Sequence, residues 1–301
     1  MKNTRLAYII GIAGAISWGV SFIGAKTALD YMEPIQVMAV RMTVAVITFG
    51  AFILIGSVKL NFKNKSIKSL LILSVAQPCL YGVFEILGID ITTASESAII
   101  LSMVPITVTV LSAIFFKEKI KFMTAGFVFL SFLGVIVTVM GNLSASGKII
   151  GYMFLLLAVI TGAVYTMLSK QISVSFGPIE ITFVMTIVGF IFFNALNFML
   201  GYGFEAYVLT TRIPELLYAI LFLGVICSVF AFIAYNHLVA TVPAYKASTL
   251  ILSVLTVTAV IAGIAFRGDS FTIYKLTGLV MILAGVIGVS QPEKLKGENN
   301  E

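Results

Sequence analysis

The chain has 301 residues, of which 60% are hydrophobic and 11% charged, and its formal net charge is +6. Soluble domains have about 45–50% apolar and about 25% charged residues, so this composition excludes an ordinary soluble protein and predicts an all-α integral membrane protein. The basic residues lie in short loops and not along one helix face, which argues against a nucleic-acid partner and favours contact with membrane lipid.

Apolar segments follow one another along almost the whole chain, and a membrane-spanning helix needs about 20 mostly apolar residues. In chain order, the ten candidate helices are Leu6–Leu29, Pro34–Val58, Leu70–Ile89, Ser97–Phe116, Phe122–Gly141, Ile149–Ser169, Ile179–Gly201, Ile213–Asn236, Ala247–Phe266 and Leu276–Ser290. The first segment is longer than the apolar region of a signal peptide, so we expect it to remain in the protein. The sequence therefore predicts ten transmembrane helices.

Lysine and arginine are distributed unevenly between alternate loops. If the N-terminus is cytoplasmic, the cytoplasmic side carries thirteen of these residues and the outside carries four, namely Lys148, Arg212, Arg267 and Lys275. Cytoplasmic loops of membrane proteins carry such an excess of positive charge. This pattern predicts a multi-pass protein of the cell (plasma) membrane with both termini in the cytoplasm.

The second half of the sequence resembles the first. A shift of 144 residues places SWGVSFIGAK (17–26) over TGAVYTMLSK (161–170), and a shift of 151 residues places Gln77, Tyr81 and Glu85 over Ser228, Phe232 and Asn236. Five helices in each half is an odd number, so the second half must enter the membrane from the opposite side, as in inverted-repeat transporters. We expect two inverted five-helix repeats at residues 1–145 and 146–290, followed by a cytoplasmic tail at 291–301.

Several stretches resemble the EamA family of the drug/metabolite transporter superfamily. They are SWGVSFIGAK, VMAVRMTVAV around Arg41, ITTASESAIILSMVPI, FFKEKI and TAGFVFLSFLGVIV. The resemblance extends over nearly the whole chain, and it implies ten helices, two EamA repeats and export or uptake of a small metabolite. One departure is Leu255-Thr256 in the second half, where the first half has Val104-Pro105. These motifs identify the family and leave the substrate open.

Polar, aromatic or small residues recur at three- or four-residue spacing on four of the predicted helices, and this spacing places them on one helix face. These sets are Gln77, Tyr81 and Glu85; Ser228, Phe232 and Asn236; Ser17, Ser21 and Gly24; and Thr161, Tyr165 and Ser169. Such faces suit the wall of a water-filled cavity, although hydrogen bonding between helices would use the same residue types.

Two charged residues, Glu85 and Arg41, lie inside predicted spans. At 1.5 Å per residue, they lie about 6 Å and about 9 Å from the outer ends of their helices. Three roles are open for Glu85: a structural bridge to Arg41, a site that exchanges a proton or meets a cationic group of the substrate, or snorkelling to the interface.

The candidate substrate-binding residues share a position on these faces or a charge or aromatic ring within a span. They are Trp18, Ser21, Arg41, Gln77, Tyr81, Glu85, Tyr165, Ser228, Phe232 and Asn236. Trp18 either offers a cation–π surface or packs as an ordinary core residue. Elsewhere, Glu96 is placed to cap a helix N-terminus, Lys26 and Lys170 are expected to anchor helix ends at the interface, and Asn194 and Asn197 either line the cavity or join helices.

The expected function is a secondary transporter that moves a small organic metabolite by alternating access. The solute is expected to be amino acid-like, aromatic or amphiphilic, with export as the favoured direction and protons as the candidate coupling ion. The alternative is a passive facilitator or a channel-like permease without ion coupling. One histidine and no intramembrane Asp pair argue against an enzyme, and the sequence lacks the GxxxxGKS or GxxxxGKT motif of ATP-hydrolysing proteins. No cofactor or metal is expected.

Overall fold

The computed structural model describes residues 2–58, 60–63, 65–116, 122–140 and 148–290. Within these ranges the chain is built of helices and short connections, without a strand. The tail predicted at 291–301 lies outside the described residues.

The first half of the chain contains α1 (Lys2–Leu29), α2 (Pro34–Leu54), α3 (Lys68–Ser74), the π-helix η1 (Val75–Leu80), α4 (Tyr81–Ile91), α5 (Ala94–Leu101), α6 (Val104–Phe116) and α7 (Phe122–Met140). The second half contains α8 (Lys148–Ile172), α9 (Pro178–Met199), α10 (Glu205–Arg212), α11 (Pro214–Leu221), the π-helix η2 (Phe222–Phe230), α12 (Ala231–Thr241), α13 (Ala244–Arg267) and α14 (Ile273–Ser290).

Nine helical stretches of the described chain are long and apolar enough to cross a membrane. They are Thr4–Leu29, Pro34–Leu54, Lys68–Ile91, Ala94–Phe115, Phe122–Met140, Lys148–Ile172, Pro178–Met199, Pro214–Thr241 and Ala244–Arg267. The tenth predicted helix corresponds to α14, whose apolar stretch, Ile273–Val289, falls short of this length. The chain is thus a multi-pass membrane protein with nine candidate spans among the described residues, where the sequence predicted ten.

Three predicted helices are interrupted in the structure. Gln77 has the extended backbone angles φ −142° and ψ 119° within η1, directly before Pro78, and a proline ring disfavours the helical conformation of the preceding residue. Two turn residues, Ser102 and Met103, separate α5 from α6 shortly before Pro105, and η2 widens the helix between α11 and α12. The short helix α10 was not predicted, because eight residues with charged ends resemble a loop.

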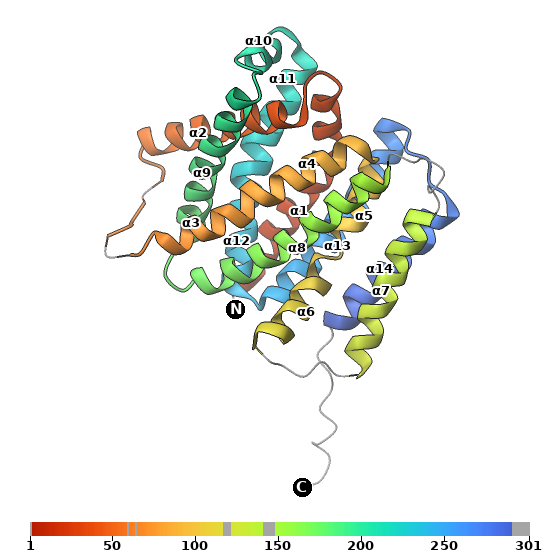
Figure 1. Ribbon diagram of the computed structural model, residues 1–301. Coiled ribbons are helices and arrows are strands. Elements are labelled where there is room, and N and C mark those ends of the chain that lie inside the picture. Colours follow the sequence, from red (N-terminus) through yellow and green to blue (C-terminus); the bar gives the residue numbers. More distant parts are fainter. Residues whose placement is uncertain (1, 59, 64, 117–121, 141–147, 291–301) are drawn as a thin grey trace.

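The two halves of the chain interlock and do not form separate bundles. Helix α1 packs against α12 and α13, α4 packs against α8, and α2 packs against α9. Helices α7 and α14 pair along their length at one edge of the molecule, as Figure 1 shows. Most elements therefore bury one face against the other half of the sequence.

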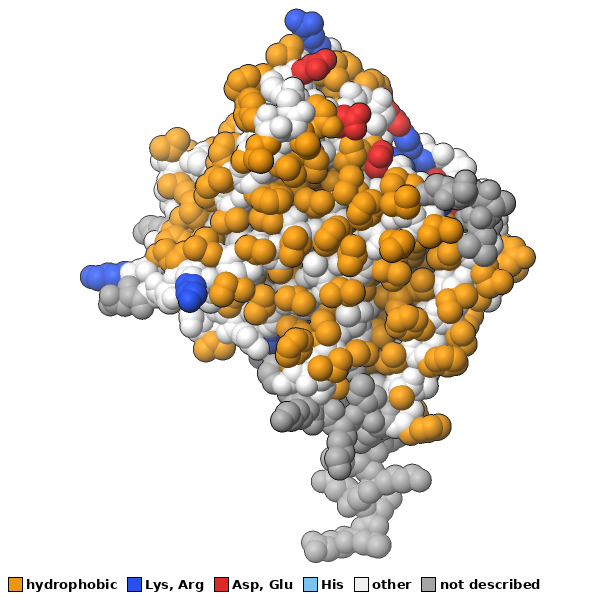
Figure 2. Space-filling model, viewed as in Figure 1, with side chains coloured by type: hydrophobic (Ala, Val, Ile, Leu, Met, Phe, Trp, Pro, Cys, Tyr) orange, Lys and Arg blue, Asp and Glu red, His pale blue; other side chains and the backbone are white. Residues whose placement is uncertain are grey.

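The surface of the molecule agrees with a membrane environment. Hydrophobic side chains cover most of the face in Figure 2, and charged groups gather towards its ends. We call the end where α1 finishes, with Asp30, Glu96, Arg267 and Lys275, the Lys26 end. The opposite end, with the last turn of α12 and the first turn of α9, is the Lys170 end.

Candidate functional site

A cavity of about 70 Å³ lies between helices of both halves. Since a buried water needs about 10–15 Å³ on the same measure, the cavity has room for several waters or part of a small solute. Its lining residues are Trp18, Ser21, Phe22, Arg41, Gln77, Tyr81, Glu85, Val104, Gly162, Tyr165, Thr166, Phe232, Tyr235, Leu252 and Leu255.

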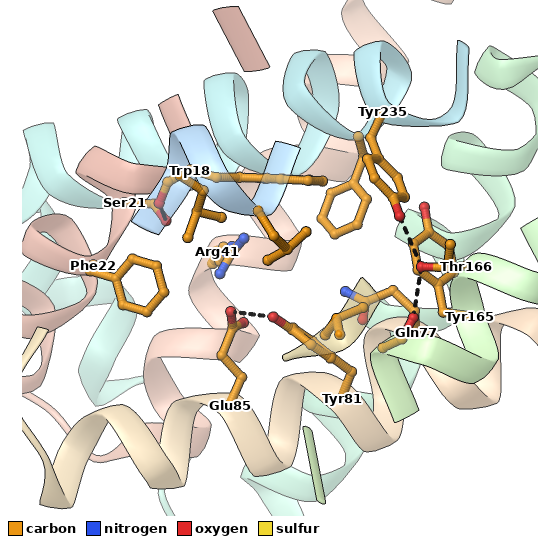
Figure 3. Close-up of a pocket in the computed structure, with 15 residues that line it drawn as sticks. Trp18, Ser21, Phe22, Arg41, Gln77, Tyr81, Glu85, Tyr165, Thr166 and Tyr235 are labelled. Atoms are coloured by element: carbon orange, nitrogen blue, oxygen red, sulfur yellow. Dashed lines mark hydrogen bonds between the residues drawn. The ribbon is translucent and has the colours of Figure 1, made fainter. Parts of the chain in front are cut away.

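Two opposite charges face this cavity. Figure 3 shows the Glu85 carboxylate on α4 pointing across towards the Arg41 guanidinium on α2. The carboxylate accepts a hydrogen bond from the Tyr81 hydroxyl, one turn earlier on the same helix, at 2.9 Å. No direct ion pair joins Arg41 to Glu85 among the contacts of the described residues. The structural bridge considered from the sequence is thus not formed in this conformation.

Arg41 is held by Ser228, which lies behind the cavity wall. It is 8% exposed, and its Nε donates to the Ser228 hydroxyl at 2.7 Å. Ser228 in turn donates to the Leu223 carbonyl at 2.9 Å, a bond that spans the widened turn of η2. Nε is the one nitrogen of this guanidinium with a protein acceptor among the described residues. The outer guanidinium nitrogens are therefore free to bind a ligand in the cavity.

The break in the third span positions the other polar residues. The extended conformation at Gln77 places this buried side chain on the cavity wall. The helix resumes at Tyr81, and the four-residue spacing then places Tyr81 and Glu85 on one face. This shared face of Tyr81 and Glu85 was predicted from the sequence, whereas Gln77, expected on the same continuous helix, reaches the wall at the break.

An aromatic wall faces the charged one. The Trp18 indole donates to the Cys227 carbonyl at 3.0 Å, and its ring lies 4.8 Å from Phe232 at 70°. Tyr165 and Tyr235 are stacked, with ring centroids 5.9 Å apart. Aromatic pairs in these arrangements are favourable beyond their burial, so the wall is ordered before any ligand enters.

A buried amide joins three helices at the Lys170 side of the cavity. Asn236 is fully buried, and its Oδ1 accepts hydrogen bonds from Tyr165 at 2.9 Å and from Ser169 at 2.7 Å. Its Nδ2 donates to Thr182 on α9 at 3.0 Å. These bonds connect α8, α9 and α12 directly behind the aromatic wall.

Eight of the ten candidate residues therefore line the cavity, and Ser228 and Asn236 stand behind it as hydrogen-bond partners of Arg41 and Tyr165. Seven lining residues were missed: Phe22, Val104, Gly162, Thr166, Tyr235, Leu252 and Leu255. Most are apolar or small, so nothing in their helices distinguishes them from core residues. Gly162 and Thr166 could have been found, because they lie within one turn of Tyr165.

The remaining charged residues have mainly structural contacts. Glu96 forms the predicted cap, because it exchanges backbone and side-chain hydrogen bonds with Thr93. It also forms an ion pair with Lys275 at 3.0 Å, which the sequence reasoning did not foresee. Lys26 donates to the Asp90 carbonyl at the end of α4, and Lys170 donates to three carbonyls at the end of α12.

The predicted asparagines lie away from this cavity. Asn194 on α9 binds Thr43 of α2 and Tyr207 of α10, so it joins helices. Asn197 donates to the Gly203 carbonyl and fixes the turn after α9. Asp30 lies just after the first span, and hydrogen bonds from the Arg267 guanidinium hold the pKa of its carboxyl below its ordinary value.

Comparison with known proteins assigns the family. The chain is 32% identical over 288 residues to the "Uncharacterized transporter YcxC" of Bacillus subtilis (strain 168), covering 94% of this chain and 92% of that protein. It is 26% identical to the "Uncharacterized transporter YetK" of the same organism, covering 95% and 87%. A crystal structure with a TM-score of 0.64 and 14% identity covers 94% of this chain and 97% of that one, which shows a similar fold. The EamA-like transporter family model matches residues 5–140 and again residues 149–291, so the chain belongs to the EamA-like transporter family.

Proposed function

We propose that this protein is a secondary transporter that carries a small organic solute through the central cavity by alternating access. The observation that supports this most strongly is the cavity itself. It lies between the two halves of the chain and combines two opposite charges, Arg41 and Glu85, with an aromatic wall. Transporter sites lie near mid-membrane at the interface of two repeats. An amino acid-like, aromatic or amphiphilic solute suits walls that are largely apolar and aromatic.

Matched contacts at opposite ends support two inverted repeats. Lys26 binds the carbonyl end of α4, and Lys170, its counterpart after a shift of 144 residues, binds the carbonyl end of α12. Helix C-termini carry unsatisfied carbonyls and partial negative charge, which attract a cation. The same shift matches the capping contact of Gln36 with the Glu33 amide to that of Glu180 with the Gly177 amide. Repeated contacts of this kind are expected of two copies of one five-helix unit.

The test is solute flux through purified protein in lipid vesicles. Vesicles are loaded with a mixed panel of amino acids, aromatic acids and amines, and efflux of each solute is followed by mass spectrometry with and without a proton gradient. We expect efflux of a small subset of the panel, with export as the working direction. Accumulation of a solute against its own gradient, when it requires the proton gradient, indicates coupled transport. Downhill flux alone indicates the passive facilitator.

A cavity-filling variant shows whether the flux uses this site. A Cβ at Gly162 would lie 3.1 Å from the Tyr81 ring, so Gly162→Leu places bulk in the cavity and should abolish efflux. Gly126 on α7 has open space around it, so Gly126→Leu is the matched control and should retain efflux. Equal flux in both variants would contradict transport through this cavity.

A further inference from the structure

The charges in the cavity restrict what the substrate can be. We propose that Arg41 binds a carboxylate of the substrate and that Glu85 requires one compensating positive charge to enter with it. The inference rests on the proposed function and names its substrate class: an organic carboxylate that either carries its own ammonium group or travels with a proton.

The orientation of Arg41 suits a carboxylate ligand. Its Nε is occupied by Ser228, and this bond fixes the guanidinium plane with its outer nitrogens towards the cavity. A guanidinium binds a carboxylate through two parallel hydrogen bonds, and this geometry is specific for planar anions. Arg41 is also 8% exposed, so an anion bound to it is largely shielded from bulk solvent.

A bound carboxylate changes the net charge of the cavity. The empty cavity contains Arg41 and Glu85, whose charges compensate each other across the space, and much of the remaining wall is apolar, including Phe22, Leu252 and Leu255. A substrate carboxylate on Arg41 adds one negative charge to this environment. An uncompensated charge is costly in an apolar, membrane-buried site. One positive charge therefore has to accompany the carboxylate.

The carboxylate of Glu85 is the group that can receive this positive charge. One carboxylate oxygen of Glu85 accepts from Tyr81, and the other has no donor among the described residues. Besides Glu85, the ionisable groups in the cavity wall are Tyr81 on the same helix, Arg41 on α2, Tyr165 on α8 and Tyr235 on α12, and Cys227 on η2 lies near Glu85 outside the wall. Helices α1 and α13 contribute Trp18, Ser21, Leu252 and Leu255 to the wall.

Glu85 is thus the one carboxylate in the described wall of this cavity. A substrate ammonium binds it directly. For a substrate without an amine, Glu85 takes up one proton from the bulk solution and forms an O–H bond, which balances the charge in the same way.

Three probes with the same phenyl body separate the possibilities: phenylalanine, which is a zwitterion, hydrocinnamate, which is a carboxylate alone, and phenethylamine, which is an amine alone. Binding is measured by thermal shift and calorimetry on detergent-solubilised full-length protein across a pH series. Phenylalanine should bind throughout the series. Hydrocinnamate should bind about tenfold more tightly for each unit by which pH falls, until Glu85 is protonated, because its binding takes up one proton. Phenethylamine should not bind.

Two substitutions test the roles of the charges. Glu85→Gln should remove the pH dependence of hydrocinnamate binding and weaken phenylalanine by about tenfold, since a charge-assisted hydrogen bond is lost. Arg41→Gln should weaken both carboxylates by at least about tenfold. Arg41→Lys retains the charge without the planar fork and should give an intermediate loss, which keeps the test informative if Arg41→Gln does not fold.

Three results would overturn the inference: preferred binding of phenethylamine by the wild type, an unchanged pH profile for hydrocinnamate in Glu85→Gln, or no binding of either carboxylate. These outcomes are separable from failure of the proposed function. Cavity-dependent flux of other solutes would leave the transporter standing and remove only the carboxylate rule. Absence of cavity-dependent flux for every panel solute would remove the function itself.

Discussion

Three carboxylates of this chain differ in surroundings and therefore in role. Asp30 is half exposed and meets Arg267 through two hydrogen bonds at 2.7 and 3.0 Å. Glu96 is fully buried and pairs with Lys275, whose side chain is 1% exposed. Glu85 faces the cavity with only a tyrosine hydroxyl as its bonded partner in the described structure. The first two suit stability at the Lys26 end, and the third suits ligand binding.

The buried pair should dominate the stability of the Lys26 end. Lys275→Met removes the close 3.0 Å partner of Glu96, and breaking a buried ion pair costs about 3–5 kcal/mol. Lys148 is the matched control, because it reaches Glu96 at 3.4 Å with 26% of its side chain exposed, and Lys148→Met should cost less than about 1 kcal/mol. Thermal unfolding in detergent measures both, and similar losses would show that burial does not set the strength of these pairs.

The exposed pair should give a pH-dependent contribution. Because the Arg267 hydrogen bonds lower the pKa of Asp30, the pair stabilises the folded state above the usual aspartate pKa and loses this effect as pH falls through the lowered value. With side chains 49% and 29% exposed, screening limits the effect to about 1 kcal/mol or less.

Asp30→Asn should therefore lower the melting temperature slightly at neutral pH, and this deficit should shrink as pH falls through the lowered pKa of Asp30. Glu205→Gln is the control, since the described residues form no ion pair with this exposed side chain. A deficit for Asp30→Asn that persists unchanged at low pH would contradict the electrostatic explanation.

At the scale of the helices, hydrophobic runs located the spans, and prolines caused the main errors. The third and fourth predicted spans continue through Pro78 and Pro105, whereas the structure breaks each one just before the proline. The interruptions matter, because the first of them places Gln77 on the cavity wall. A proline disfavours the helical conformation of the residue before it, and this local effect is not visible in the hydrophobicity that located the spans.

Packing between helices also decides which site residues could be predicted from the sequence. Trp18, Arg41 and Glu85 are conspicuous in apolar helices, and each lines the cavity. Val104, Leu252 and Leu255 do so as well, but their sequence context is that of a lipid-facing or core residue. Which face of an apolar helix is turned inwards depends on packing against other helices, and the single sequence does not contain that information.

Helices α7 and α14 test close packing directly. A Cβ at Gly278 of α14 would lie 2.6 Å from the Gly134 carbonyl of α7, closer than the backbone permits, so the two helices meet through glycine. Gly278→Leu should separate the pair and cost at least about 1–3 kcal/mol, the usual range for overpacking. Gly126→Leu adds the same side chain to α7 in open space and should be neutral. Equal melting temperatures for the two variants would refute this close contact.

At the scale of the whole molecule, the account depends on the halves having opposite orientation. Interlocked packing of α1 with α12 and α13, and of α4 with α8, surrounds the cavity with elements of both halves. Two inverted copies of one unit can exchange their conformations, and this exchange exposes a central site to each side in turn. If the two halves had the same orientation, the matched contacts of Lys26 and Lys170 would not support an inverted repeat.

Cysteine labelling in intact cells measures this orientation most directly. The native cysteines, Cys79 and Cys227, are buried, so the parent protein should give little background. Tyr31 follows α1 and Ser175 follows α8, and both are exposed. A membrane-impermeant maleimide should label Tyr31→Cys in intact cells and Ser175→Cys only after the membrane is permeabilised. Labelling of both residues from the same side would contradict the inverted arrangement and the alternating-access account that depends on it.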